Sequence, residues 1–376
     1  EISPRQGMIR LREFTQAEAE IFVHPDEKNH PKFSRYASYS MPLFTAEAQE
    51  REGSAVTATM REAVDKGMIA NEYVAYYLAL THQMLLKIGV KPDRLRFRQH
   101  LCDERAHYAS DCWDAEVHSD RFGWVETVGI ADRTDYDLNA HAKQSGTAMT
   151  VFIQYAEPKK VQRRRVVPNM GVLGKQYRQK AKAIFAALEH AEPTAEGADV
   201  TVEGETIHIP ANLFQVRDEV VDVRGEDIVP HVIEPSYGID RMCYAVLEQA
   251  YDEDTADGET RTVLRLSPAV APVQVAVFPL MARDGLDTLA EEITHTLHGR
   301  GILAEYDDSG AIGRRYRRQD EIGTPFAITV DYDSKENHTV TLRDRDSMKQ
   351  VRIAIDRLPE TLCALVEGNV KFAELK

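Results

Sequence analysis

A proline-containing segment at residues 266–272 (LSPAVAP) divides the chain into two parts of different character. After it, short apolar runs alternate with amphipathic stretches. Strands are predicted at 273–278, 326–330 and 340–345, and helices at 285–300 and 349–366. Alternation of strands and helices at this spacing is typical of a small α/β domain with a largely parallel sheet. We therefore expect such a domain over residues 273–376.

The part before this boundary has a different pattern. Bulky and small or polar residues alternate with the period of a strand. Two insertions interrupt them, a helical, loop-rich one at about 24–94 and a polar, charge-rich one at about 150–228. Strands are predicted at 1–23, 109–117, 124–128, 200–209 (as a pair) and 229–238, and helices at 73–90, 177–190 and 239–251.

The charge balance limits the range of partners. The chain has 46 basic and 61 acidic residues, a net charge of −15. A protein that binds nucleic acid has to neutralise phosphates with Lys and Arg. The acidity therefore indicates either no nucleic-acid partner or a solvated surface suited to high salt, and the acidic segment 251–259 favours the second interpretation.

Cysteine and histidine positions give no sign of a metal site. The four cysteines form no CxxC pair, so we expect no zinc site, no disulfide framework and a reducing, cytoplasmic location. His100 and His107 have no metal-ligand spacing and are expected to be structural. No apolar run reaches 18 residues and no secretory leader is seen, so no membrane partner is expected.

The opening segment places chemically distinct side chains at every second position. In a strand, one face would carry Arg10, Arg12, Phe14, Gln16, Glu18 and Glu20. Guanidinium groups suit phosphates, an aromatic ring suits a flat base, and a carboxylate suits an amine. The alternatives are a charged edge strand that binds nothing and, because Gln, Ala and Glu favour helices, a helix that scatters these groups.

Residues 234–241 (EPSYGIDR) predict a strand, a tight turn and the start of a helix. The free N–H groups at a helix start attract anions, and Arg241 in the first turn could reach one. Glu234 and Ser236 could hold a small polar substrate. The alternative is a capped helix with a solvated arginine.

Two further segments have candidate binding residues. Glu126 lies in an otherwise apolar strand, where a carboxylate is costly unless it binds Mg²⁺ near phosphates or forms an ion pair. In 310–323, four arginines surround Tyr316, and Arg343 and Arg345 follow. A basic patch with an aromatic ring suits single-stranded RNA, although a charge run can also be a solvated face.

Together these motifs resemble class II glycyl-tRNA synthetases of the archaeal and eukaryotic type. The opening segment is similar to the second signature motif of that family, and 234–241 to the third. Residues 96–116 (RFRQHLCDERAHYASDCWDAE) and 309–331 also resemble it, so that the similarity covers nearly the whole chain. The resemblance implies an α+β fold, with an antiparallel class II sheet and helical insertions in a partial catalytic domain, 1–265, followed by an α/β anticodon-binding domain, 273–376. It implies ATP-dependent activation of glycine and its transfer to the 3′ end of tRNA(Gly), with Mg²⁺, by a homodimer.

The resemblance also implies the site residues. ATP would be bound by Glu1, Ile9, Arg10, Leu11, Arg12, Glu13, Phe14, Glu126, Thr127, Gly238, Ile239, Asp240 and Arg241. Glycine would be bound by Phe14, Thr15, Gln16, Ala17, Glu18, Glu234, Pro235, Ser236, Tyr237 and Gly238. Arg10 and Arg241 would be catalytic, and Glu126 would hold Mg²⁺. The anticodon would meet Arg314, Arg315, Tyr316, Arg317, Arg318 and Arg343.

One departure from the family pattern concerns the start of the chain. The second motif of the family continues upstream of Glu1 with Phe-Arg-Asn, whose arginine grips the α-phosphate, and the first motif builds the dimer interface. We therefore expect a C-terminal portion of a longer protein, or one half of a split enzyme. Two other hypotheses stay open: a synthetase-derived RNA-binding protein without ligase activity, and a synthetase for another small amino acid.

Overall fold

A computed structural model describes residues 7–104, 108–188, 191, 194, 196–202, 204–256 and 258–375. The chain forms two compact units. One comprises Glu1–Ala140 with Pro230–Lys376, and the other comprises His141–Val229. No helix in the described ranges combines the length and the apolar character needed to cross a membrane.

A six-stranded antiparallel sheet is the centre of the first unit. Its order is β1-β12-β7-β6-β5, and β2 also pairs with β12. The strands are β1 (Gln16–Glu18), β2 (Ile21–Val23), β5 (Leu95–Gln99), β6 (Asp111–Ser119), β7 (Gly123–Thr134) and β12 (His231–Gly238). This sheet confirms the antiparallel α+β architecture that the resemblance implied.

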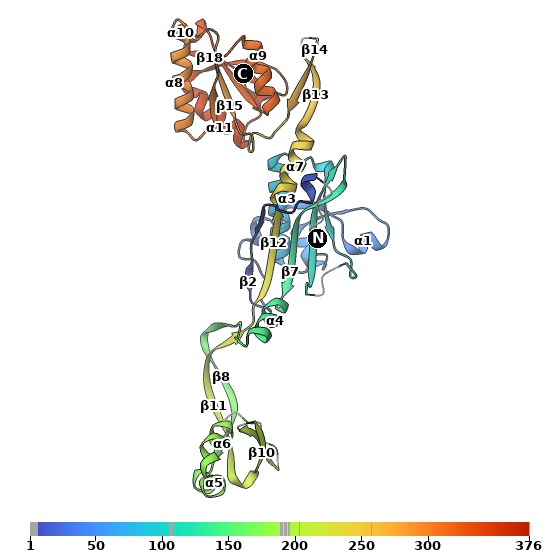
Figure 1. The fold of residues 1–376 in the computed structure, drawn as a ribbon, viewed down its shortest axis with the longest axis vertical. Coiled ribbons are helices and arrows are strands. Elements are labelled where there is room, and N and C mark those ends of the chain that lie inside the picture. The colour runs from blue at the N-terminus through green and yellow to red at the C-terminus, as the bar shows by residue number, and fades with distance from the viewer. Residues whose placement is uncertain are drawn as a thin grey trace. The chain divides into compact units, whose positions relative to one another are not determined.

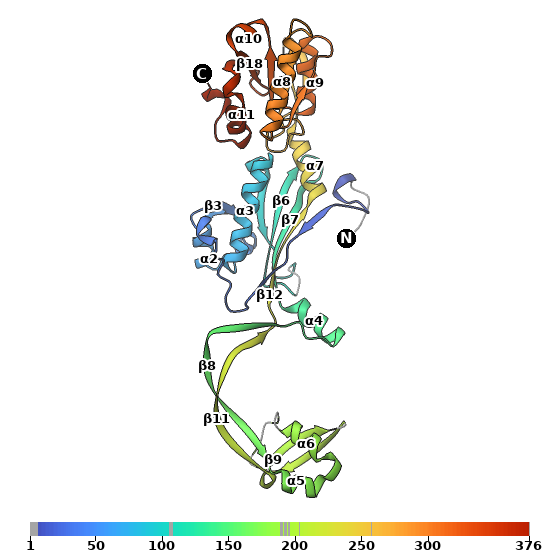
Figure 2. The same ribbon diagram turned by 90° about the vertical axis from the view of Figure 1, so that its left-hand side faces the viewer.

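Helices α3 (Glu72–Ile88) and α7 (Ile239–Ala250) pack with this sheet in one core (Figure 2). Alternate strand residues such as Trp113, Ile130 and Ile233 are buried there. Their neighbours along β6, β7 and β12 are mainly polar. The polar set includes Asp114, Glu126, Glu234 and Ser236. The sheet therefore combines an apolar side with a polar surface.

Helix α3 confirms the helix predicted at 73–90. Asn71 caps its start by accepting a hydrogen bond from the Val74 N–H, and Gly89 ends it with φ of 109°. The rest of the segment 24–94 forms α1 (Ala46–Glu50), α2 (Met60–Asp65) and the strand pair β3 (Ser40–Leu43) and β4 (Val56–Thr59). Met41 and Met60 from these elements are buried in the core that includes Trp113, so this segment is part of the domain it interrupts.

The prediction of one long strand over 1–23 is wrong, and so is the helical alternative. Residues 1–6 lie outside the described ranges. A short 3-10 helix, η1 (Gly7–Ile9), is followed by irregular residues 10–15 and then by β1 and β2. Only Gln16 and Glu18 share a strand face. The conformation is set by tertiary bonds instead, since the Arg241 side chain donates to the Ile9 carbonyl.

The second unit has a long antiparallel ribbon of β8 (Val151–Pro168) and β11 (Phe214–Ile228). At one end of the ribbon lie α5 (Met170–Tyr177), α6 (Ala181–Leu188) and the pair β9 (Gly197–Val202) and β10 (Glu205–Pro210), around a core that contains Leu173 and Ile184 (Figure 1). The predicted strand pair is confirmed. The helix predicted at 177–190 is the shorter α6, and α5 and the ribbon were missed. Helix α4 (Tyr136–Ser145) spans the boundary of the two units.

The C-terminal domain has a five-stranded sheet of order β16-β15-β17-β18-β19. The strands are β15 (Val275–Pro279), β16 (Ala304–Tyr306), β17 (Phe326–Val330), β18 (Thr339–Asp344) and β19 (Gln350–Ala354), and the helices are α8 (Leu286–Gly299), α9 (Ile312–Ile322), α10 (Tyr332–Asn337) and α11 (Leu358–Glu367). Val275 and Val277 pack with α8, whereas Ala276 and Phe278 pack with α9, so the two helices cover opposite faces of the sheet (Figure 1).

Three predictions for this region need correction. The sheet is mixed rather than largely parallel, because β18 and β19 are antiparallel to their neighbours. The helix predicted at 349–366 begins only at Leu358, since 350–354 is β19. No strand was predicted in the acidic segment 251–259, but β13 (Tyr251–Ala256) and β14 (Glu259–Leu264) form a hairpin there, and the intervening Asp257 lies outside the described residues.

Candidate active site

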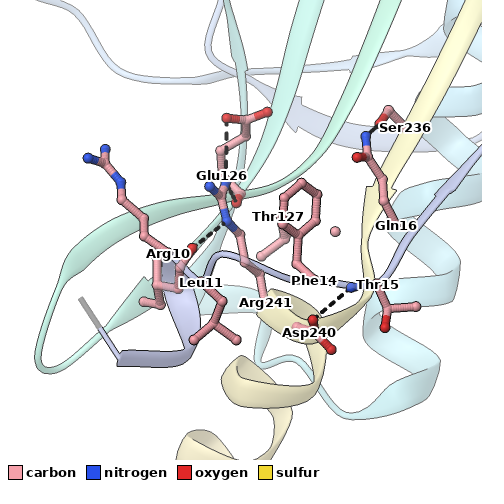
Figure 3. Close-up of a pocket in the computed structure, with 12 residues that line it drawn as sticks. Arg10, Leu11, Phe14, Thr15, Gln16, Glu126, Thr127, Ser236, Asp240 and Arg241 are labelled. Carbon is pink, nitrogen blue, oxygen red and sulfur yellow. Dashed lines mark hydrogen bonds and ion pairs between the residues drawn. The ribbon is translucent and has the colours of Figure 1, made fainter. Parts of the chain in front are cut away.

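A pocket of about 250 Å³ opens on the polar surface of the antiparallel sheet (Figure 3). Its walls come from the opening segment, β7, the end of β12 and the start of α7. The lining residues are Ile9, Arg10, Leu11, Phe14, Thr15, Gln16, Glu126, Thr127, Ser236, Gly238, Asp240 and Arg241. The fold thus brings together three segments that the sequence predicted separately.

Other predicted residues lie beside the pocket or face elsewhere. Outside its lining are Arg12, Glu13, Ala17, Glu18, Glu234, Pro235, Tyr237 and Ile239, while Glu1 lies outside the described residues. Pro235 is buried, and the Tyr237 hydroxyl lies 3.1 Å from Thr81 Oγ1 of α3. Strand alternation therefore turns these two side chains into the core, away from Glu234 and Ser236.

Arg241 joins the opening segment to β7. Its Nε donates to the Ile9 carbonyl at 3.1 Å and its Nη1 to the Glu126 carbonyl at 2.8 Å. The neighbouring Asp240 accepts a hydrogen bond from the Thr15 N–H at 2.8 Å. About a third of the Arg241 side chain stays exposed (33%). This geometry presents a fixed cation at the positive end of α7, where an anion is favoured.

Glu126 differs from its prediction, because its side chain is exposed (53%) and lies 3.7 Å from Arg241 Nη1. Surrounding protein atoms raise the pKa of Glu126 by desolvation, and Asp114 adds to this, while Arg241 opposes it. A Cβ atom at Gly129 would lie 3.6 Å from Glu126 Oε1 and 4.0 Å from Asp114 Oδ1. The two carboxylates thus converge over Gly129, and a cation bound there would relieve their repulsion.

The side chain of Thr127 has a structural role. Its hydroxyl is buried and donates to the Ala115 carbonyl at 2.9 Å. By contrast, the Phe14 ring is 52% exposed and lies in the middle of the pocket (Figure 3). An exposed aromatic face in a pocket can stack on a flat ring.

At the other end of the pocket, Gln16, Glu18 and Ser236 form a hydrogen-bonded cluster. Gln16 Nε2 donates to Ser236 Oγ at 2.5 Å, and Ser236 Oγ donates to Glu18 Oε1 at 3.0 Å. The Gln16 amide also contacts the Glu18 carboxylate. The cluster exists because β1 pairs with β12 and sets Glu18 opposite Ser236.

Arg133 holds Glu234, one of the predicted site residues, in a contact that sequence reasoning missed. Its Nη1 lies 2.9 Å from both carboxylate oxygens of Glu234, and its Nε donates to Asp137 at 3.0 Å. The guanidinium also lies over the Tyr108 ring, 4.5 Å from its centroid. No local pattern announces this contact, since it depends on the pairing of β7 with β12.

His100 lies near the candidate site, although its spacing in the sequence gave no sign of a role there. Its Nε2 lies 2.8 Å from Asp114 Oδ2. This hydrogen bond, with a further contribution from Cys112, raises the pKa of His100 to about 10. Ligand atoms of His100, Cys112 and Asp114 lie within 4.8 Å of one another. The fold therefore assembles a His–Cys–Asp group that the sequence did not reveal, whereas His107 lies outside the described residues.

The basic patch expected around Tyr316 is largely internal. Arg315 is buried and donates to the carbonyls of Pro279 and Gly310, at 2.6 and 2.8 Å. Arg343 is also buried, with hydrogen bonds to Asp320 of 2.9 and 3.1 Å.

Tyr316 itself packs on Phe278, with ring centroids 5.1 Å apart. Arg345, which was grouped with the patch, is buried as well. Arg314 and Arg318 are exposed, and Arg317 is partly so. The interpretation of the whole run as one open RNA-binding patch is therefore wrong, because half of its cations hold the domain together.

Comparison with known proteins identifies the C-terminal domain first. Residues 274–365 match the family model described as "Anticodon binding domain". The fold can also be aligned with a crystal structure of prolyl-tRNA synthetase from Cryptosporidium parvum complexed with L-proline and AMP. That alignment has a TM-score of 0.49 and 15% identity, and covers 98% of this chain and 53% of the other.

Sequence relatives are more specific. The chain is 51% identical to a glycine–tRNA ligase of Methanothrix thermoacetophila and 50% identical to one of Archaeoglobus fulgidus, over all of this chain and 65% of each relative. A glycine–tRNA ligase of Methanocaldococcus jannaschii is 46% identical over 96% of this chain. The chain is thus a homologue of archaeal glycine–tRNA ligases and spans 65% of their length, which confirms the resemblance seen in its motifs.

Proposed function

We propose that this chain provides the nucleotide and amino-acid site of a glycine–tRNA ligase, which activates glycine with ATP and transfers it to the 3′ end of tRNA(Gly). The observation that carries the proposal is that one pocket gathers three kinds of group. They are a fixed cation, Arg241, an open aromatic ring, Phe14, and the polar cluster that Gln16 and Ser236 form with Glu18. These groups suit phosphates, a flat base and a small amino acid.

ATP would be held by its two ends. Phe14 would stack on adenine, and Arg10 and Arg241 would bind the phosphates. Glu126, near Asp114, would hold Mg²⁺, which screens phosphate charge when it is bound. Hydrogen bonds to the carbonyls of Ile9 and Glu126 already hold the Arg241 side chain. This side chain therefore loses little further conformational entropy when the nucleotide binds.

The reaction needs no covalent bond to the protein. A glycine carboxylate oxygen forms a bond to the α-phosphorus while the bond from that phosphorus to the β-phosphate oxygen breaks, giving glycyl-adenylate and pyrophosphate. Negative charge shifts onto the leaving pyrophosphate, and Arg241 would stabilise it there. A hydroxyl of the terminal adenosine of tRNA would then take the glycyl group and release AMP.

Selection of glycine would depend on the small volume of the pocket and on the negative charge of its carboxylates. Glu18 would accept hydrogen bonds from the substrate ammonium, and Gln16 and Ser236 stand beside it. Glu234, which Arg133 fixes, would form the adjoining wall. A rigid polar wall excludes an added methyl group by steric clash. An apolar pocket distinguishes substrates that differ by one methylene by only about 1–3 kcal/mol.

The remaining assignments follow from the same proposal. Residues 1–265 would be part of the catalytic domain, and 273–376 would bind the anticodon with Arg314, Arg317 and Arg318. The protein would act as a homodimer in the cytoplasm, with Mg²⁺ and without zinc.

Glycine-dependent exchange of pyrophosphate into ATP, measured on the complete protein, tests the proposal. We expect exchange with glycine and, with alanine or serine, at least about a hundredfold less, since clash discriminates better than a missing contact. An Arg241→Ala protein should lose exchange and retain the antiparallel sheet. Binding of tRNA without exchange would instead support the RNA-binding alternative, and exchange driven by alanine or serine would contradict the glycine pocket.

A further inference from the structure

Three side chains with metal-binding atoms, those of His100, Cys112 and Asp114, lie together on the antiparallel sheet. Cys112 and Asp114 are two residues apart on β6 and therefore share one face of the sheet. The His100 N–H donates to the Cys112 carbonyl at 2.9 Å, which continues the pairing of β5 with β6 by one residue. The backbone hydrogen bonds of the sheet thus fix the positions of all three residues.

The three side chains already face one another. Their ligand atoms lie within 4.8 Å of one another, and His100 Nε2 lies 2.8 Å from Asp114 Oδ2. The ligand atoms of a tetrahedral zinc ion lie about 3.3–3.8 Å apart, because its bonds are about 2.0–2.3 Å long. Small side-chain rotations on an unchanged backbone would therefore complete three bonds to such an ion, which would replace the proton between His100 and Asp114.

The neighbouring strand leaves room for the ion and for a fourth ligand. Cys112 pairs with Ala131 of β7, and Asp114 pairs with Gly129, so that β7 places only a methyl group and a hydrogen atom there. Cys112 is partly exposed, and the side chains of His100 and Asp114 are 22% and 11% exposed. An ion from solution can therefore reach the group, and a water molecule can take the open position, as in zinc sites with three protein ligands.

The ligand atoms select the kind of ion. Thiolate sulfur and imidazole nitrogen favour zinc and similar thiophilic divalent ions, whereas Mg²⁺ prefers oxygen ligands. Arg98 lies opposite Asp114 in the pairing of β5 with β6, but its guanidinium is bonded to Glu104. The nearest strand neighbour of Asp114 on β5 therefore has its own acidic partner, and Asp114 is directed to His100.

Asp114 belongs to two groups at once. Its Oδ2 faces His100, while its Oδ1 lies with Glu126 Oε1 over Gly129, where the proposed function places Mg²⁺. Two divalent ions that share one carboxylate repel each other, and each withdraws negative charge from the ligand of the other. An ion held by His100 and Cys112 would therefore weaken the binding of Mg²⁺ beside Glu126.

We propose that His100, Cys112 and Asp114 form a binding site for a thiophilic divalent ion such as Zn²⁺, and that an ion bound there inhibits the activation of glycine by weakening Mg²⁺ binding at Asp114. The binding site is independent of the proposed function, whereas the inhibition rests on it. The reaction itself uses no zinc, so this ion is an inhibitor and not a cofactor.

Binding is measured first, on the complete, metal-free protein without substrates. Calorimetric titration with Zn²⁺ gives stoichiometry and affinity, and titration with Co²⁺ gives a thiolate-to-cobalt charge-transfer band where a cysteine binds the ion. The variant is Cys112→Ser, which keeps the size of the side chain and loses the sulfur, and Cys112→Ala takes its place if that protein does not fold. The matched control is Cys363→Ser, since Cys363 is also partly exposed but lies in α11.

We expect Cys112→Ser to bind one Zn²⁺ fewer than wild type, or to bind it at least about tenfold more weakly, because the thiolate is the ligand that favours this ion most. The variant should also lose a cobalt charge-transfer band that Cys363→Ser retains. Equal zinc binding by wild type and Cys112→Ser, or cobalt spectra that do not differ between them, would overturn the site.

Inhibition is measured by glycine-dependent pyrophosphate exchange at varied Mg²⁺, with Zn²⁺ at a concentration that saturates the site. The Mg²⁺ concentration for half-maximal exchange should rise at least about fivefold in wild type and in Cys363→Ser, the lower end of the usual coupling between sites. It should stay within about twofold in Cys112→Ser. Zinc binding without this rise, or an equal rise in Cys112→Ser, would overturn the inhibition. A wild-type protein without exchange in zinc-free buffer would instead refute the proposed function, and the binding result would stand.

Discussion

Arg133 Nη1 lies 2.9 Å from both carboxylate oxygens of Glu234, across the pairing of β7 with β12. Glu234 is only 14% exposed, so its carboxylate depends on this partner. The pair therefore fixes one wall of the proposed glycine pocket before any substrate arrives.

Replacing Arg133 by methionine leaves Glu234 without its partner in a mostly buried place. We expect the KM for glycine to rise about tenfold or more, equivalent to at least 1.4 kcal/mol, because the wall loses its fixed orientation. The KM for ATP should change little, since Arg133 does not line the pocket around Arg241. Pyrophosphate exchange at varied glycine and ATP measures both, and an equal rise of the two would contradict the assignment.

Phe14→Leu retains an apolar side chain but loses the flat face. We expect the KM for ATP to rise about five- to tenfold, as the loss of an aromatic stack worth about 1 kcal/mol predicts, with the KM for glycine near wild type. Phe22→Leu is the matched control, because Phe22 is similarly exposed, at 54%, and lies outside the pocket. Equal effects of the two substitutions would argue against stacking on Phe14.

The His100–Asp114 pair predicts a dependence of stability on pH. The pKa of His100 is raised from 6.5 to about 10, so the folded state binds this proton more tightly than the unfolded chain. The stabilisation is complete below pH about 6.5 and is lost as the pH rises toward about 10. Urea unfolding of wild type and His100→Gln between pH 6 and 10 should show the difference shrinking with pH. A difference that is constant over this range would contradict the paired, protonated histidine.

Gly323 is predicted to tolerate no side chain. It ends α9 with φ of 90°, and a Cβ atom there would lie 2.7 Å from Leu266 Cδ1. Gly323→Ala should lower the free energy of unfolding by about 1–2 kcal/mol for the left-handed backbone, and by more for the clash. Gly368→Ala, with φ of 79° and open space around it, isolates the backbone part. Equal losses at the two positions would mean that the contact with Leu266 relaxes freely.

The parts of the fold that could be predicted are those whose local pattern agrees with their packing. Helix α3 has an apolar face, an asparagine cap and a terminal glycine, and each of these favours the same structure. The ribbon of β8 and β11 was missed because its side chains are mostly exposed, and a strand without a buried face has no alternation to read.

In the candidate site, too, the features that depend on long-range contacts could not be predicted. The end of β12 and the start of α7 were predicted from their own residues, but the opening segment takes its shape from Arg241, which lies 232 positions from Ile9. The arginine run around Tyr316 was misinterpreted for a similar reason. Its pattern shows the cations, whereas Asp320 and the carbonyl of Pro279, which bind Arg343 and Arg315, become partners only in the folded domain.

A crystal structure of the complete protein with a non-hydrolysable analogue of glycyl-adenylate tests the central claim most directly. We predict that its adenine stacks on Phe14 and that its amino group is bound by Glu18 beside Ser236. An analogue that binds outside this pocket, or one bound with its amino group away from Glu18 and Ser236, would contradict the account.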